Sequence, residues 1–231
     1  GKEPGNPQVP GATMGWPRRA AGFFRQLVQR FDTDVVAARR GIHKQDLRSP
    51  SEDPIDWARI GPFVALHLGC AAVLWVGASA VAVWTCVALY GLRMVAITGF
   101  YHRYFSHRAF KTSRPMQFLL AVAGNTAVQR GPLWWAAHHR VHHKHSDNDR
   151  DVHSPHTRSL LWSHMGWFLG RSNLATDYGQ IRDFARYREL RWLNRFDMVV
   201  PLLLAVALFG AGWILEFTAP ELGTTRWQML V

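Results

Sequence analysis

The sequence predicts an all-α integral membrane protein in which helical hairpins cross the bilayer and a histidine-rich helical cap holds a metal site. Two long apolar stretches, residues 62–101 and 196–215, alternate with strongly basic segments. Ten of the 12 histidines lie between residues 102 and 164. A net charge of +11 coexists with 48% hydrophobic residues because charge and apolarity are segregated along the chain. This pattern is typical of membrane spans that carry a polar site at one face.

The apolar stretch 62–101 contains one full charge, Arg93. Because a membrane helix needs about 20 apolar residues, the stretch predicts two spans, 62–81 and 83–101, joined by a very short turn. A third span is predicted at 196–215, where Pro201 lies one turn inside the helix and is tolerated. A soluble buried hairpin is the alternative, but soluble cores seldom need two such helices in succession. Residues 160–170 are apolar but too short to span, and their two tryptophans suit the membrane interface.

Residues 1–60 form a polar, basic segment that precedes the predicted membrane domain, 61–231. Residues 1–20 are rich in Gly and Pro and are expected to be disordered. Within 21–59, apolar residues recur at helical spacing among arginines, namely Phe23, Phe24, Leu27, Val28 and Phe31. This spacing predicts a short amphipathic helix, lying either on an anionic membrane surface or in the cytosol. Cys70 and Cys86 fall in apolar segments and are expected to be buried thiols and not a disulfide.

The distribution of basic residues predicts the orientation in the membrane. Residues 1–59 carry 10 Lys and Arg, and residues 102–195 carry 15. These blocks flank a tight hairpin, so they are expected on the same side of the membrane. Because basic residues are retained on the cytoplasmic side, the clustered histidines between them are predicted to be cytoplasmic.

The histidines form two tight clusters, 102–107 and 138–143, about 30 residues apart. Residues three and four apart share a helix face, so His139, His142 and His143 can present three imidazoles on one stripe. His102 and His107 diverge by about 140° on a regular helix. They can bind one metal centre together only if the helix ends between them. Otherwise they bind two separate metal ions, or opposite sides of a pair of metal ions.

Imidazole is the commonest protein ligand for iron and zinc. A surface histidine or a pH switch needs only one or two imidazoles, so neither explains two clusters. A site without cysteine thiolates is unlike a structural zinc site. Many imidazoles with few carboxylates suit iron that performs oxygen chemistry, although zinc also accepts three histidines.

The two clusters have the form HxxxxH and, about 30 residues later, HxxHH. Together with their flanking strings Gly99–Lys111 and Trp134–Lys144, and with Asp151–His156 and Trp162–Trp167, they resemble the membrane fatty-acid desaturase superfamily. The resemblance is to its acyl-CoA delta-9 (stearoyl-CoA type) branch, and it runs from about residue 60 to residue 231.

This resemblance implies a di-iron, O2-dependent desaturase that introduces a cis double bond into a saturated acyl chain. By position it implies five iron ligands: His102, His107, His139, His142 and His143. His138 is an additional histidine outside this set. The remaining histidines of the region are expected to be structural or to support the ligands: His145, His153, His156 and His164.

The resemblance also implies two substrate contacts. Trp135 matches a tryptophan that binds near the acyl thioester, and Arg171 matches a basic contact to the CoA phosphates. Ala137 and Ser172 replace basic residues there, which leaves the acyl carrier open among CoA, a carrier protein and a lipid.

A third histidine box of the family has no counterpart, since no histidine follows His164. Five ligands do not complete two irons, so the desaturase domain is expected to be incomplete at its C-terminal end and inactive alone. No haem or iron–sulfur motif occurs, so electrons are expected from a partner of ferredoxin or cytochrome b5 type with its reductase. A membrane di-iron hydroxylase is the alternative function. A nucleic-acid binder is excluded because the basic blocks alternate with spans and carry no binding motif.

Overall fold

The computed structural model describes residues 16–42 and 53–231, and their regular secondary structure is helical apart from one isolated bridge between Ile55 and Gly170. This confirms the predicted all-α fold. Of residues 1–20, which were expected to be disordered, residues 1–15 lie outside the described residues. Residues 16–20 form the first turn of α1. The longer helices are α1 (Trp16–Phe31), α2 (Thr33–Arg40), α3 (Trp57–Ala71), α5 (Ala80–Val95), the π-helix η3 (Ala96–Ser106), α6 (Arg114–Asn125), α7 (Pro132–His145), α10 (Arg188–Arg195) and α11 (Val199–Thr218).

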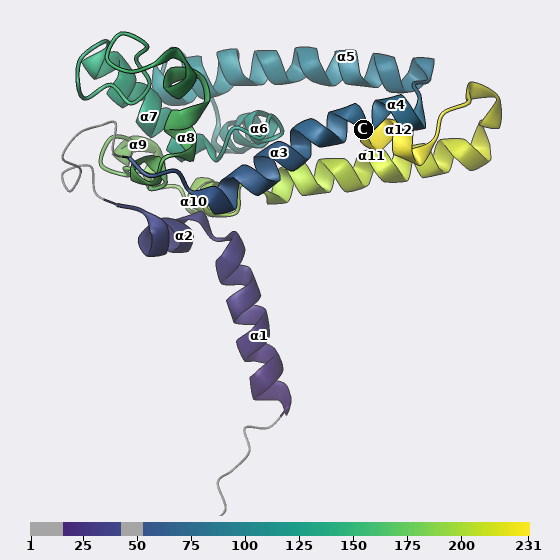
Figure 1. Cartoon of the computed structure of the whole chain (residues 1–231), viewed down its shortest axis with the longest axis horizontal. Coiled ribbons are helices and arrows are strands. Elements are labelled where there is room, and N and C mark those ends of the chain that lie inside the picture. Colours follow the sequence, from purple (N-terminus) through teal and green to yellow (C-terminus); the bar gives the residue numbers. More distant parts are fainter. Residues whose placement is uncertain (1–15, 43–52) are drawn as a thin grey trace, which may run out of the picture.

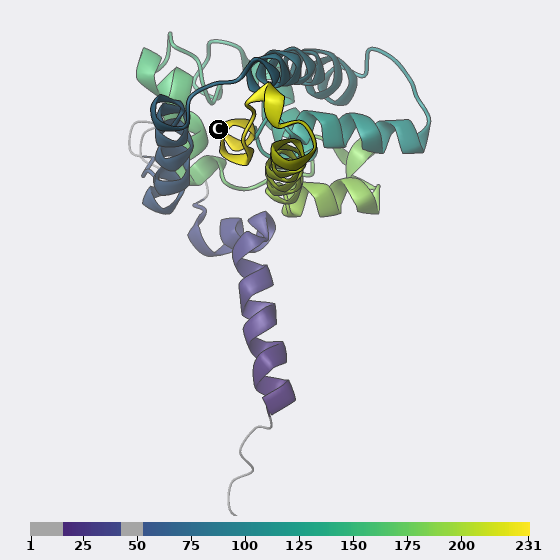
Figure 2. The same ribbon diagram turned by 90° about the vertical axis from the view of Figure 1, so that its right-hand side faces the viewer.

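Shorter helical segments connect these elements. They are α4 (Val73–Val76), η4 (Trp162–Gly166), α8 (Trp167–Leu169), η5 (Arg171–Asn173), α9 (Arg182–Ala185), η6 (Pro220–Leu222) and α12 (Arg226–Leu230). The apolar segment 160–170, predicted to be too short to span, forms η4 and α8. The C-terminal α12 turns back beside α11, and Figure 2 shows it between α3 and α11.

Three helical stretches are long and apolar enough to cross a membrane: Trp57–Val76, Ala80–Ser106 and Val199–Thr218. Their side chains face outward; Leu74 and Trp75 are each 81% exposed. Such surfaces are stable only in contact with lipid or another apolar partner. Cys70 and Cys86 are free thiols and not a disulfide, as expected, but both are exposed on these outward faces, so the expectation that they are buried is wrong.

The turn between the first two spans lies at residues 77–79, several residues earlier than the predicted 81–83. Gly77 adopts φ 70°, a left-handed conformation that glycine reaches without steric cost. The Ser79 hydroxyl then accepts a hydrogen bond from the Ala82 amide at 3.2 Å and caps α5. The first span begins at Trp57 because Asp56 caps α3 through the Ala58 amide at 3.2 Å.

The buried core lies at one end of the spans, where η3, α6, α7 and α10 pack together (Figure 1). Its fully buried side chains include Tyr101, Phe105, Leu133, Leu190 and Leu193. Gly124 of α6 lies against the Tyr101 ring, where a Cβ atom would overlap it. The core therefore fixes the end of η3 against α7, and these two helices carry the histidine clusters.

The start of α7 is held by polar contacts from α10 and the residues after it. Asn194 Oδ1 accepts a hydrogen bond from the Trp134 amide at 2.7 Å. Gly131 approaches so closely that a Cβ atom would lie 2.5 Å from Asn194 Cα. Beside it, Arg130 Nε donates to the buried Asp197 carboxylate at 2.9 Å. These contacts fix the position and direction of the first turn of α7, which precedes its histidines.

Candidate metal centre

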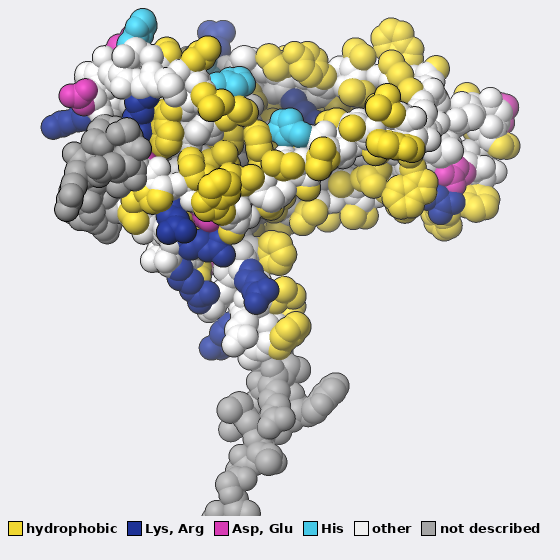
Figure 3. All heavy atoms as spheres, in the orientation of Figure 1, with side chains coloured by type: hydrophobic (Ala, Val, Ile, Leu, Met, Phe, Trp, Pro, Cys, Tyr) yellow, Lys and Arg dark blue, Asp and Glu magenta, His cyan; other side chains and the backbone are white. Residues whose placement is uncertain are grey.

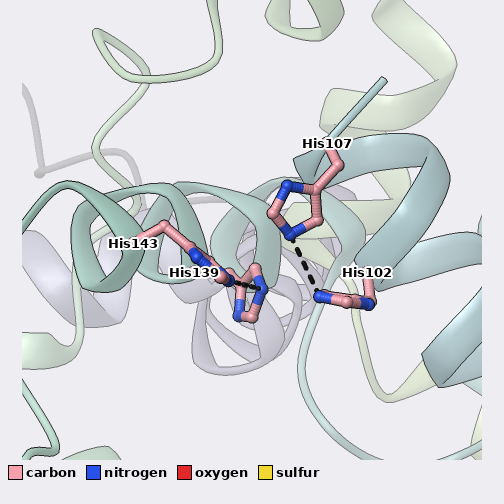
Figure 4. Close-up of side chains that lie close together, drawn as sticks. All are labelled: His102, His107, His139 and His143. Carbon is pink, nitrogen blue, oxygen red and sulfur yellow. Dashed lines mark hydrogen bonds between the residues drawn. The ribbon is translucent and has the colours of Figure 1, made fainter. Parts of the chain in front are cut away.

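Four histidines converge from two helices (Figure 4). His102 and His107 lie at the end of η3, and His139 and His143 lie on α7. One ring nitrogen from each residue lies within 4.8 Å of those of the other three. The Nε2 atoms of His102 and His107 are 3.0 Å apart, and those of His139 and His143 are 2.9 Å apart. We call these residues the four-histidine cluster.

The π-helix explains how His102 and His107 meet. In a π-helix each amide bonds the carbonyl five residues earlier, and the His107 amide bonds the His102 carbonyl at 3.1 Å. Residues five apart therefore lie one turn above each other. The sequence suggested that the helix ends between these histidines or that they serve separate positions. A widened helical turn brings them together instead.

His139 and His143 meet because they are four apart on a regular α-helix. The His139 ring lies 4.7 Å from the His102 ring and 4.5 Å from the His143 ring, measured between centroids. Trp135, one turn earlier, stacks on His139 at 4.7 Å. The His139 ring is therefore in contact with an indole as well as with the other imidazoles.

Arg140 clamps the two helices together beside the cluster. Its guanidinium donates to the Phe105 carbonyl at 2.7 Å and the Ser106 carbonyl at 3.0 Å. It also forms two hydrogen bonds with the Asp183 carboxylate, at 2.9 and 3.0 Å. Burial alone would raise the pKa of Asp183, but Arg140 and Arg108 hold that pKa below its usual value. The last carbonyls of the π-helix, which a helix leaves unpaired, are thereby bound from α7.

The electrostatics of the cluster favour neutral imidazoles. Burial, and then the neighbouring histidines, lower the pKa of His139 to about 3. Burial first, and then neighbouring histidines, also lower the pKa of His107 and of His143, and Arg140 adds a smaller contribution at His107. A neutral imidazole keeps a lone pair for a metal, so the cluster is ready to bind metal at neutral pH.

The donor set fits a metal ion. Two nitrogens that each lie about 2.1 Å from one ion, at right angles, are about 3.0 Å apart, close to the distances within each histidine pair. The cluster itself contains only imidazoles, the ligands that suit iron, zinc, copper and nickel. Two close, neutral Nε2 atoms can share only one hydrogen bond, and a bound ion would satisfy all four lone pairs.

A second group, His142, Asp151 and His153, lies beside the first and also has metal-ligand spacing. The three imidazoles that α7 was predicted to present together lie close to one another: the His142 ring is 6.0 Å from that of His139 and 5.4 Å from that of His143, between centroids. His142 turns to Asp151, whose carboxylate oxygens lie 2.9 and 3.0 Å from His142 Nδ1. The His153 ring stacks on His142 at 4.2 Å. The Asp151 carboxylate therefore accepts a hydrogen bond from His142 Nδ1, which leaves the Nε2 atom of His142 available to bind a metal ion.

Asp151 is buried and accepts three donors. Besides His142, the amides of Asp147 and His153 bond it, each at 3.1 Å. Burial would raise the pKa of Asp151, but these hydrogen bonds hold it below its usual value. Carboxylates that hold a ligating imidazole in this way fix its tautomer and increase its basicity.

Replacing Asp151 with asparagine is therefore expected to weaken metal binding by about 10- to 100-fold, the usual effect of losing such a partner. Isothermal titration of the purified protein with iron(II) or zinc would measure the change. Asp149→Asn, at an exposed position in the same loop, is the matched control and should leave affinity unchanged. Equal affinities in the two variants would contradict the role of Asp151.

The remaining predicted residues take separate positions. His138 is buried against Trp134 and Trp167, with its Nδ1 2.9 Å from the Trp134 carbonyl. His156 and His164 are exposed, and His145 ends α7. Trp135 lies beside the cluster. Arg171 lies in η5, where its amide bonds the Pro54 carbonyl at 3.0 Å.

Sequence reasoning missed Arg140 and Asp151. Both lie inside or next to the histidine strings, and this position was the signal in the sequence that could have identified them. Ser172 also has a partner that the sequence did not suggest, since its hydroxyl donates to Asp53 at 2.7 Å.

A model of the family described as fatty acid desaturase matches residues 78–227. The chain is similar to the sn-1 stearoyl-lipid 9-desaturase of Anabaena variabilis, with 30% identity over 72% of this chain and 62% of that protein. It is also 30% identical to the chloroplastic palmitoyl-monogalactosyldiacylglycerol delta-7 desaturase of Arabidopsis thaliana, over 85% of this chain and 57% of that protein. Identity to the acyl-CoA Delta-9 desaturase of Acheta domesticus is 35%, over 54% of this chain and 36% of that protein.

The chain thus spans between about a third and two thirds of the length of these relatives. The matched region includes the last two candidate spans, both histidine groups and the core that joins them. The family match agrees with the resemblance seen in the histidine strings. The chain belongs to the fatty acid desaturase family.

Proposed function

We propose that this protein is an oxygen-dependent desaturase that introduces a cis double bond at carbon 9 of a saturated fatty acyl chain. The observation that carries the proposal is the convergence of four imidazoles from η3 and α7 in a chain of this family. Two of the three relatives described above are named for action at position 9. Their names describe both a lipid-linked and a CoA-linked acyl chain, and we propose acyl-CoA as the substrate, with lipid as the alternative.

In this proposal His102, His107, His139 and His143 hold one iron ion, and His142 contributes to a second. When bound, the iron pair supplies the O2-dependent oxidation that takes two hydrogen atoms from adjacent carbons. Asp151 keeps His142 in one tautomer, and Arg140 keeps the end of η3 against α7. These residues set where the oxidising centre lies, and that position decides which carbons react.

A small cavity of about 70 Å³ lies between the two histidine groups. It is lined by Trp135, His138, His139, His153 and Trp167. We propose that it receives part of the acyl chain, since its aromatic walls exclude water beside His139. Trp135 then contacts both substrate and ligand, and Arg171 contacts the acyl carrier.

The reaction balances only with external electrons: O2, two electrons and two protons, with the two hydrogens removed, give two water molecules. A ferredoxin or cytochrome b5 with its reductase is the proposed donor. The protein is a membrane protein, and we propose that its spans form a multi-pass domain with the histidines on the cytoplasmic side. Among the described residues, the basic side chains of residues 22–42 and 102–195 lie mostly at the histidine end of the spans, the arrangement that the charge rule favours for the cytoplasmic side.

Feeding deuterated stearate to desaturase-deficient cells would test this function. The cells would express either residues 1–231 or a longer chain that supplies a third histidine box. We expect deuterated product with a cis double bond at carbon 9, located by mass spectrometry, from the longer chain. We expect none from residues 1–231 alone and none from the His139→Ala variant of the longer chain. A short pulse, with acyl-CoA and lipid pools analysed separately, identifies the carrier by which pool gains the double bond first. Hydroxystearate would favour the membrane hydroxylase, and a lack of both products from the longer chain would contradict the proposal.

A further inference from the structure

The N-terminal helix α1 projects from the body of the protein and runs crosswise to the spans. Both ribbon views show this direction, and Figure 1 places α1 level with the ends where α3 and α11 begin. A helix perpendicular to membrane spans runs parallel to the plane of the bilayer. Its level places it near the boundary between lipid and water at the histidine end.

One face of α1 is apolar and largely exposed. Phe23 and Phe24 are 69% and 67% exposed, and Leu27, Val28 and Phe31 continue the face toward α2. Figure 3 shows hydrophobic side chains on the flank that faces along the direction of the spans, and basic side chains on the opposite flank. The apolar face is thus turned toward the membrane interior and not toward the cap.

This face continues into the lipid-facing surface of α11. Val28 and Phe31 line an apolar groove of about 360 Å³ with Trp192, Phe196, Met198, Val199 and Leu202. Beyond the groove, Leu203 and Val206 of the span are 63% and 69% exposed. Because those span residues require lipid, a lipid chain that covers them also reaches the face of α1.

The connection between α1 and the body is fixed by polar contacts. Asp32 caps α2 and pairs with Arg195 of α10. Thr33 donates to the Asn194 carbonyl at 3.0 Å, and the Tyr178 hydroxyl donates to Asp34 at 2.9 Å. These contacts fix the point at which α1 leaves the body, and most of them come from α10, which also positions α7.

We propose that α1 lies in the leaflet surface at the histidine end, with its apolar face among acyl chains and its arginines at the phosphates of anionic lipids. The sequence of α1 contains Arg18, Arg19, Arg25 and Arg30 and no acidic residue. Helices of this composition bind in the plane of anionic interfaces. Of the two positions that the sequence left open, membrane surface or cytosol, the geometry points to the membrane. The proposal is independent of the desaturase activity.

Site-directed labelling of the whole protein in lipid nanodiscs tests this placement. Phe24→Cys and Gln26→Cys would each be made in a Cys70→Ser, Cys86→Ser background and labelled with the fluorophore NBD. The two positions lie on opposite flanks of α1, so Gln26 is the matched control. Discs of phosphatidylcholine, with or without phosphatidylglycerol, provide neutral and anionic surfaces.

We expect NBD at position 24 to emit at shorter wavelength and to resist reduction by aqueous dithionite, whereas NBD at position 26 is reduced rapidly. Protection of position 24 should be greater in the anionic discs, and Arg25→Gln with Arg30→Gln should remove that difference. Equal, rapid reduction at both positions would overturn the proposal. So would protection of position 24 that appears only in discs holding two copies, because the occupant would then be a second chain. Equal protection in both disc types would overturn the preference for anionic lipid.

Discussion

Replacing His139 with alanine is expected to lower the affinity of the four-histidine cluster for metal by more than about 100-fold, beyond the effect of losing a supporting partner. His139 lies at the centre of the cluster: its ring contacts those of His102, His107 and His143, at 4.7, 5.4 and 4.5 Å between centroids. Removing it leaves three imidazoles and opens the site beside Trp135. Competition titration against a chelator of known affinity would measure the loss.

The matched control is His145→Ala, which removes a histidine from the last turn of the same helix, outside both histidine groups. It should bind metal as the unaltered protein does, and both variants should show the same helical circular dichroism. Retention of full affinity by the His139 variant would show that metal binds elsewhere.

Replacing Arg140 with methionine is expected to destabilise the protein by about 3 kcal/mol, the lower end of the usual cost of breaking a buried ion pair. The substitution leaves two carbonyls at the end of η3 and part of the Asp183 carboxylate without their donor. The Arg140 side chain is 20% exposed, so solvent compensates only in part. Thermal unfolding in detergent would measure the loss as a fall in Tm.

Arg108 provides the matched control because it pairs with the same Asp183 carboxylate, at 3.4 Å, from a side chain that is 67% exposed. Arg108→Met should cost less than about 1 kcal/mol, as exposed ion pairs do. Arg140→Met should also weaken metal binding, since the carbonyls it holds precede His107. Similar Tm values for the two variants would contradict the claim that Arg140 holds the end of η3 against α7.

The all-α architecture and the three spans could be predicted from the sequence because lipid imposes long apolar runs on any spanning helix. The predicted ends of the spans were less accurate. The first span begins at Trp57 and the turn lies at Gly77, since a cap at Asp56 and a left-handed glycine decide these boundaries. Both signals are local and are easily hidden within a continuous apolar stretch.

The histidine clusters could be identified as a candidate site, but their division could not. The π-helical turn that joins His102 to His107 depends on one hydrogen-bond register, which leaves no pattern in the residues. The second group depends on the pairing of His142 with Asp151, nine residues away across a loop. Such pairings arise from tertiary packing and are visible only when the chain is folded.

The central claim is that imidazoles from η3 and α7 bind metal together. X-ray absorption of the purified, iron-loaded protein tests it most directly, because the signal reports the atoms bound to the metal. We predict a nitrogen and oxygen shell with imidazole scattering, no sulfur, and a loss of imidazole scattering in the His139→Ala variant. An iron content no higher than that of the variant, or a spectrum unchanged by the substitution, would contradict the account.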